Sequence, residues 1–241
     1  IGTGWSHSIA VVAKEIAVED IDTVLTNRNP IELGITYHSS VDKSKGKAIM
    51  QHRVNTWGFN ENKHNELGRR SSSESAPTTT PCLVTLPISL FQVLSVSCGR
   101  RHSAMLVRDL SSSNSIKIFT WGESRHGALG LGKAVKKAAT PTLVHFTPNE
   151  TMKSKESITH GEEKSLKEEG RGLSISSIHC GLDFTICVSS NHKIISWGSN
   201  KYGQLGDGTI LDKYKPELIT NVEAPIQSIS VGWTHVLALC S

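Results

Sequence analysis

Residues 196–209 read S-W-G-S-N-K-Y-G-Q-L-G-D-G-T, a tryptophan followed by glycines at positions 198, 203, 206 and 208. A short apolar pair, Ile194 and Ile195, comes directly before this stretch. Two weaker copies lie upstream, at residues 56–68 and 120–130. The last two copies keep the same spacing from Trp-Gly to Leu-Gly, and the first is two residues longer. A unit that recurs with its glycines in place indicates a repeat protein.

A second unit alternates with the first and consists of a glycine, two variable residues, a histidine and an apolar run. Its glycines are Gly4, Gly99, Gly181 and Gly232. The histidines are His7, His102 and His235, and Phe184 takes their place in the third copy. Residues 93–97 and 226–230, which precede two of the glycines, alternate apolar and polar side chains. This period of two predicts half-buried strands on both sides of a tight turn.

The two units together predict a cycle of four strands. The G-x-x-H strand leads through a hairpin to the strand that ends in Trp-Gly, and the glycine-rich loop then leads to a strand headed by Pro81, Pro141 or Pro216. From Gly181 to Gly232 the period is about 50 residues, which is typical of a four-stranded propeller blade. The fold class expected from the sequence is therefore all-β.

The motif G-x-x-H-S followed by W-G-x-N-x-x-G-Q-L-G resembles the repeat of the regulator of chromosome condensation family. Residues 173–241 carry the fullest match, residues 93–148 a partial one, and residues 1–12 with 54–68 the weakest. The resemblance implies a seven-bladed β-propeller of four-stranded antiparallel blades. Four G-x-x-H units and three Trp-Gly units make about half a ring, so we expect residues 1–241 to form three to four blades and the others to lie elsewhere in a longer chain.

The repeat positions are expected to form the structural framework. They are Gly4, His7, Trp57, Gly58, Gly99, His102, Trp121, Gly122, Gly181, Trp197, Gly198, Gly203, Leu205, Gly206, Gly232 and His235. The tryptophans should pack the blades, and the glycines should permit turns that need a positive φ. For the histidines we expect a hydrogen bond to a turn carbonyl rather than a metal, because each occupies the same slot of a different repeat.

Two insertions interrupt the repeat, at about residues 14–50 and 149–172. Their composition of charged residues, Ser and Asn-Pro cannot bury a core, so both are expected to be flexible loops. Neighbouring strands of a blade are antiparallel, which places the G-x-x-H turns and the Trp-Gly loops on one face. Both insertions should therefore attach on the opposite face.

The first face is the expected partner-binding surface, because the residue after each turn glycine varies among Trp, Arg, Leu and Trp. Variable exposed residues on a rigid scaffold are typical of binding positions. The predicted partner-binding residues are Trp5, Arg100, Arg101, Arg125, His126, Lys201, Tyr202 and Trp233.

Composition narrows the remaining possibilities. The chain has no apolar run of about 18 residues, which argues against a membrane-spanning helix, and its net charge of +4 is too small to predict a nucleic-acid binder by itself. Five cysteines without a C-x-x-C pair favour reduced thiols and an intracellular location, cytoplasmic or nuclear. We expect no metal and no cofactor.

Three functions stay open. The first is a scaffold that binds a protein partner through one propeller face, and the resemblance also implies guanine-nucleotide exchange on a Ran-like small GTPase. The second is association with chromatin or nucleic acid. The third is a nucleotide-binding enzyme, because residues 127–133 fit G-x-x-x-x-G-K; however, Ala134 replaces the hydroxyl that would hold Mg²⁺, and these residues align with the repeat itself.

Overall fold

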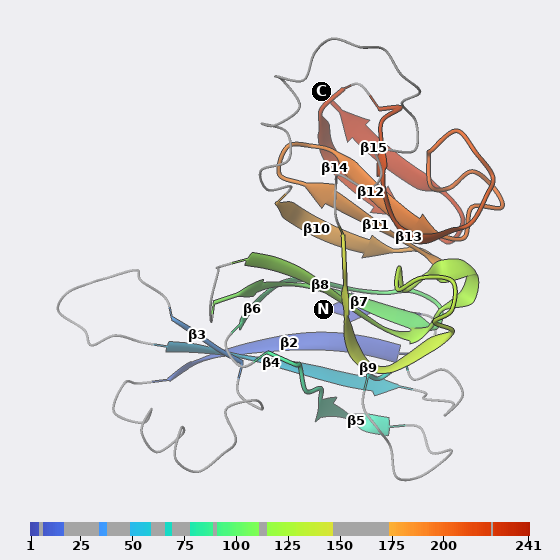
Figure 1. Ribbon diagram of the computed structural model, residues 1–241. Coiled ribbons are helices and arrows are strands. Elements are labelled where there is room, and N and C mark those ends of the chain that lie inside the picture. The colour runs from blue at the N-terminus through green and yellow to red at the C-terminus, as the bar shows by residue number, and fades with distance from the viewer. Residues whose placement is uncertain are drawn as a thin grey trace.

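In the computed structural model the chain forms successive antiparallel β-sheets that follow one another in chain order (Figure 1). The described residues are 1–4, 7–16, 34–37, 49–58, 66–68, 78–88, 91–110, 115–146, 174–222 and 224–241. Apart from strands, these residues include one 3₁₀ turn, Arg125–Gly127. The part of the chain that the structure describes contains no helix with the length and hydrophobicity needed to cross a membrane.

The second and third sheets are complete blades with four strands in sequence order. The second blade contains β6 (Phe91–Cys98), β7 (His102–Asp109), β8 (Ser115–Glu123) and β9 (Lys137–Val144). The third contains β10 (Ile175–Cys180), β11 (Phe184–Ser189), β12 (Ile194–Gly198) and β13 (Lys213–Ile219). The prediction of an incomplete all-β propeller with four-stranded antiparallel blades is confirmed.

The first and last sheets depart from this pattern. The first contains β1 (Gly2–Thr3), β2 (His7–Ile16), β4 (Ile49–Gly58) and β5 (Thr78–Leu83), and an additional strand β3 (Gly34–Tyr37) pairs with β4. The last contains β14 (Ile226–Val231) and β15 (Val236–Cys240).

Part of the first insertion is strand, which corrects the expectation of a loop over residues 14–50. β2 continues to Ile16, β4 begins at Ile49, and β3 supplies four more paired residues. The β-branched residues of these segments favour extended backbone even where the sequence between them is polar. Residues 17–33 and 38–48 lie outside the described residues, as does the whole second insertion, 149–172.

The registers agree with the expected side of attachment for both insertions. His7 pairs with Gly58, and Ile16 pairs with Ile49 at the other end of the same two strands. Val144, before the second insertion, pairs with Ile118, and Ile175, after it, pairs with Ser189. Both pairs lie at the ends of their sheets that are remote from the turns.

The three prolines that recur in the repeats lie within the fourth strands and do not head them. Pro81, Pro141 and Pro216 each fall where the register shifts, opposite the Trp of the neighbouring strand. A proline cannot donate a ladder hydrogen bond, so it is tolerated at an outer strand with an irregularity. The expected strands therefore begin three or more residues earlier than the sequence suggested.

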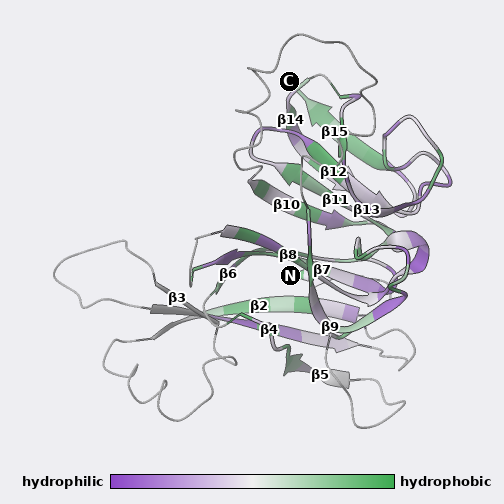
Figure 2. Ribbon diagram, in the orientation of Figure 1, coloured by the Kyte–Doolittle hydropathy of each residue, from purple (hydrophilic) through white to green (hydrophobic). Residues whose placement is uncertain are grey.

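The hydrophobic cores lie between adjacent blades. Met105 and Val107 of β7 pack toward the first blade, whereas Ala104 and Leu106 pack toward the third. Because both sides of β7 are buried, its sequence is a continuous apolar run without alternation. A third core around Phe184 joins the third blade to β14 and β15. Figure 2 shows green, apolar stretches in β11, β12 and β15, and a purple, polar 3₁₀ turn.

Candidate functional site

The G-x-x-H turns and the Trp-Gly loops lie on one face, which we call the turn face. His102 pairs with Gly122, and Phe184 pairs with Gly198, so each turn is adjacent to the end of the strand that leads into the loop. Each turn is closed by a hydrogen bond from its glycine N–H, for example from Gly99 to the carbonyl of His102 at 2.8 Å. The turn face is the surface that the strand directions predicted.

Main-chain hydrogen bonds link the turns of successive blades. The Arg100 N–H donates to the Leu182 carbonyl at 3.0 Å, and the Leu182 N–H donates to the Trp233 carbonyl at 3.0 Å. These three residues occupy the variable position after the turn glycine. Because their backbone makes the structural contact, the fold does not require a particular side chain there, which explains how Arg, Leu and Trp can alternate.

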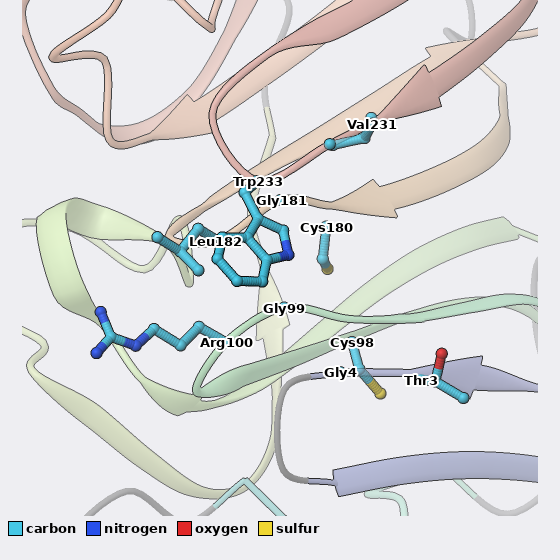
Figure 3. Close-up of a pocket in the computed structure, with 11 residues that line it drawn as sticks. Thr3, Gly4, Cys98, Gly99, Arg100, Cys180, Gly181, Leu182, Val231 and Trp233 are labelled. Carbon is cyan, nitrogen blue, oxygen red and sulfur yellow. The ribbon is translucent and has the colours of Figure 1, made fainter.

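A cavity of about 410 Å³ lies where the turns meet. Its lining includes Arg100, Leu182 and Trp233 together with the four turn glycines and the inner-strand thiols Cys98 and Cys180. Figure 3 shows the Trp233 indole beside Leu182, with the Arg100 guanidinium pointing away from the thiols. Trp233 is 62% exposed, whereas Trp5, predicted for the same role, lies outside the described residues.

The predicted basic residues are tied to acidic partners that the sequence analysis did not include. Glu123 accepts from Arg101 at 3.2 Å and from Arg125 at 3.3 Å. His126, held at φ 51°, places Nδ1 2.7 Å from the Asp212 carboxylate of the next blade. Arg101, Arg125 and His126 are thus brought together, and the charges of the two arginines are partly compensated.

Lys201 and Tyr202 lie on the loop between β12 and β13, both exposed. The Lys201 ammonium lies 5.3 Å from the centre of the Tyr202 ring. The alignment of repeats places these two residues at the positions of Arg125 and His126 in the preceding blade. The structure therefore presents the predicted pair on the turn face, one blade further along.

The buried histidines connect adjacent blades through hydroxyl groups. His7 Nε2 lies 2.8 Å from Ser103 Oγ, and His102 Nε2 lies 3.0 Å from Thr185 Oγ1. Ser103 in turn donates to a carbonyl, that of Glu66 at 3.0 Å. A hydroxyl has one proton to donate, so the histidine donates from Nε2 and the neutral Nε2–H tautomer is required. The expectation of a hydrogen bond to a turn carbonyl is corrected: the partner is a hydroxyl of the next blade.

Burial keeps these rings neutral. It lowers the pKa of His7 to about 4 and the pKa of His102 to about 3. Phe184, which replaces the histidine in the third blade, faces a different partner. The position after His235 is Val236, not Ser or Thr, and Val236 packs on the core that contains Phe184. An apolar pair thus replaces the polar pair at this junction.

The tryptophans of the Trp-Gly pairs also connect adjacent blades, each through a hydrogen bond to the preceding blade. Trp121 Nε1 donates to the Glu66 carbonyl at 2.8 Å, and Trp197 Nε1 donates to the Ala128 carbonyl at 2.9 Å. Both indoles are fully buried. The tryptophans therefore bind the loop of the preceding blade as well as filling the core, and Trp57 is half-buried at the equivalent place.

The segment that fits G-x-x-x-x-G-K, on which the nucleotide-binding alternative rests, has a structural role. Lys133 of the G-x-x-x-x-G-K segment lies 5.7 Å from the centre of the Tyr214 ring, and the Gly132 N–H donates to the Tyr214 carbonyl at 2.9 Å. The segment thus packs on the next blade. Among the described residues, no group of three or more His, Cys, Asp or Glu side chains is placed to hold a metal ion, and burial raises the pKa of the Cys180 thiol to about 12.

Residues missed by the sequence analysis include Glu123, Leu182 and Asp212. Leu182 was recognisable as a member of the variable turn position. Asp212 carried no sequence signal, because its partner His126 comes from another blade. Glu123 lies two residues before Arg125, but its second partner, Arg101, comes from a separate turn.

The chain matches only part of the length of its curated relatives, which are longer proteins. The chain is 30% identical over 198 residues to the Ultraviolet-B receptor UVR8 of Arabidopsis thaliana, covering 80% of this chain and 36% of the relative. It is 29% identical over 153 residues to the probable E3 ubiquitin-protein ligase HERC4 of Homo sapiens, covering 63% of this chain and 12% of the relative.

Solved structures share the fold. Human WBSCR16 superimposes with a TM-score of 0.55 at 22% identity, over 78% of this chain and 40% of that one. Yeast RCC1 (Prp20), solved with Kap60 bound, gives a TM-score of 0.57 at 18% identity, over 77% and 37%.

A family model described as "Regulator of chromosome condensation (RCC1) repeat" matches residues 51–106 and 191–239, and a second model of the same description matches residues 175–204. These matches cover about half of the chain and contain the turns at Gly99, Gly181 and Gly232 and the Trp-Gly pairs at Trp57 and Trp197. The chain therefore belongs to the regulator of chromosome condensation repeat family.

Proposed function

We propose that this chain is a protein-interaction scaffold that binds a protein partner through the turn face. The observation that carries the proposal is the exposed Trp233 indole beside Leu182, at the mouth of a cavity of about 410 Å³. Tryptophan is enriched among the side chains that dominate binding energy at protein interfaces. Here it projects from a turn whose backbone is already hydrogen-bonded to the neighbouring turn. Binding therefore requires little additional ordering of the turn.

Guanine-nucleotide exchange on a small GTPase is the finer form of this proposal. Exchange needs no covalent chemistry from the propeller, because a scaffold that binds the nucleotide-free GTPase more tightly shifts the equilibrium toward it. Yeast Prp20p, which shares the fold at 17% identity, is described by its binding to Gsp1p and histones. Likeness at this level supports the fold alone, so the partner class rests on the turn face itself.

The chromatin or nucleic-acid alternative has less support. Phosphate contacts need accessible cationic groups, and Arg101 and Arg125 both bind Glu123.

A photocrosslinking experiment tests the general proposal. A benzophenone amino acid is placed at position 233 of the full-length protein and, as a control, at Lys193, an exposed residue in the hairpin between β11 and β12 on the opposite face. We expect specific protein adducts from position 233 and not from position 193. The same adducts from both positions, or none from position 233, would contradict the proposal.

Exchange activity is tested separately, with small GTPases, a Ran-type protein among them, loaded with fluorescent GDP. The full-length protein should accelerate nucleotide release, and Trp233→Ala should remove the acceleration. Unchanged release would exclude exchange on those GTPases while leaving partner binding to be decided by crosslinking.

A further inference from the structure

The loop between β12 and β13 exposes three large apolar side chains, which we call the loop patch. Tyr202 is 66% exposed, Ile210 71% and Leu211 67%. Exposed apolar residues are common when isolated, but several on one short loop need an explanation.

The loop is rigid because both of its limbs are fastened to buried Asn200. Asn200 Nδ2 donates to the Asp207 carboxylate at 3.0 Å and to the Thr209 carbonyl at 3.1 Å. Its Oδ1 accepts from the Leu205 N–H at 3.0 Å. Tyr202 and Ile210 therefore project from two limbs that the Asn200 side chain holds together. A partner that binds them needs to order little of the loop.

The framework of the repeat does not require these apolar side chains. In the second blade the positions aligned with Ile210 and Leu211 are Ala134 and Val135. The loop of the second blade therefore forms with smaller side chains, Ala134 and Val135, at these positions.

The second blade also shows how much of this loop a following blade covers. There, with the third blade in contact, His126 is still 54% exposed and Ala134 is exposed. These are the positions aligned with Tyr202 and Ile210. Packing of a following blade therefore leaves this part of the loop patch accessible.

The charges of the loop determine which partner fits. Asp207 is bound by Asn200, Thr209 and Lys213, and Asp212 is bound by His126 and the Asn200 N–H. Lys201 makes no ion pair among the described residues and lies over the Tyr202 ring. The loop patch is thus apolar with a single uncompensated positive charge beside it.

We propose that the loop patch binds a protein segment that combines apolar side chains with carboxylates. The apolar side chains would cover Tyr202, Ile210 and Leu211, and a carboxylate would meet Lys201. This deepens the proposed function, since it lies on the turn face, but it concerns a contact separate from Trp233.

The test uses a phage-displayed library of random peptides, selected on the full-length protein. We expect enriched sequences that are both apolar and acidic. Binding of the corresponding synthetic peptides should weaken at least tenfold when Tyr202, Ile210 and Leu211 are all changed to serine. Ala134→Ser, the matched change in the second blade, should leave binding unchanged.

A second variant covers the case in which the triple change disturbs folding. Lys201→Gln keeps all three apolar side chains and should weaken the binding of acidic peptides and make that binding less sensitive to salt. Failure to enrich peptides, enrichment of basic sequences, or equal binding by wild type and both variants would overturn the proposal. So would loop-patch-dependent self-association in sedimentation, or loop-patch-dependent binding to phosphatidylserine vesicles.

Failure here is distinguishable from failure of the proposed function. Trp233→Ala should leave peptide binding at the loop patch intact, and crosslinking from position 233 does not depend on the loop patch.

Discussion

At the scale of single residues, the junction between blades is a relay of hydrogen bonds with a fixed direction. His102 donates to Thr185, which donates to the Ala128 carbonyl at 3.0 Å, and that carbonyl also accepts from Trp197. The relay requires a proton on Nε2, which the neutral ring supplies, whereas a second proton on Nδ1 makes the ring cationic. Protonation would put a charge into a site without compensating solvent.

This relay predicts an acid-sensitive stability. The pKa of His7 is about 4 and that of His102 about 3 in the folded chain, whereas an unfolded histidine titrates near 6.5. The contribution is fully present above the unfolded pKa, and it is lost as the pH falls below it, because the unfolded chain takes up the protons first. We expect a loss of roughly 2 kcal/mol per histidine between pH 7 and pH 5.

The control imitates the third blade by combining His102→Phe with Thr185→Val, as at Phe184 and Val236. Urea unfolding at several pH values should show about half of this pH dependence in the double variant. An unchanged profile would mean that carboxylates, and not these histidines, control acid stability.

At the scale of elements, the glycines of the Trp-Gly pair and of the loop after it meet two different constraints, steric space and backbone conformation. Gly122 has φ 103°, and a Cβ there would lie 2.3 Å from the Arg101 carbonyl oxygen. Gly132 has a similar φ of 98°, but a Cβ there would meet nothing within 4 Å. The first glycine permits the close approach of a turn and a loop, and the second only permits the backbone conformation.

Alanine substitution at the two glycines should therefore have different effects. Gly132→Ala should reduce the free energy of unfolding by about 1–2 kcal/mol from backbone strain. Gly122→Ala should cost clearly more, about 3 kcal/mol or above, because the main chain of Arg101 must move as well. Thermal and urea unfolding of both variants decide this, and equal losses would contradict the structural distinction.

At the scale of the whole molecule, stability should vary along the chain of blades. Each inner blade has a core on both sides, whereas β14 and β15 form a two-stranded sheet on which Leu237 and Leu239 are 68% and 58% exposed. Repeat architectures gain stability mainly from contacts with their neighbours. A two-stranded sheet is marginal by itself.

Hydrogen exchange of the 241-residue chain should report this gradient. Amides of β14 and β15 should exchange faster than those of β11 and β12, which are buried between blades. In a longer protein with further blades, the difference should diminish. Uniform protection in the 241-residue chain would show that the blades unfold as a single unit.

The sequence by itself determined the repeat, the strand order and the shared face of turns and loops. These follow from local patterns: period-two alternation, glycines at positive φ, and antiparallel neighbours. The strands within residues 14–50 were not predicted, because β3 has only four residues, too few for its β-branched side chains to form a clear pattern, and it depends on pairing with β4.

Only the tertiary structure decided which side chains meet. The Arg101–Glu123–Arg125 group joins separate elements, His126 reaches Asp212 of the next blade, and the histidines bind hydroxyls of the following blade. Repeat periodicity shows which positions are equivalent, but contacts between blades depend on the rotation from one sheet to the next. For that reason the sequence located the turn face, whereas the charge balance around it and the exposed loop patch came from the packed structure.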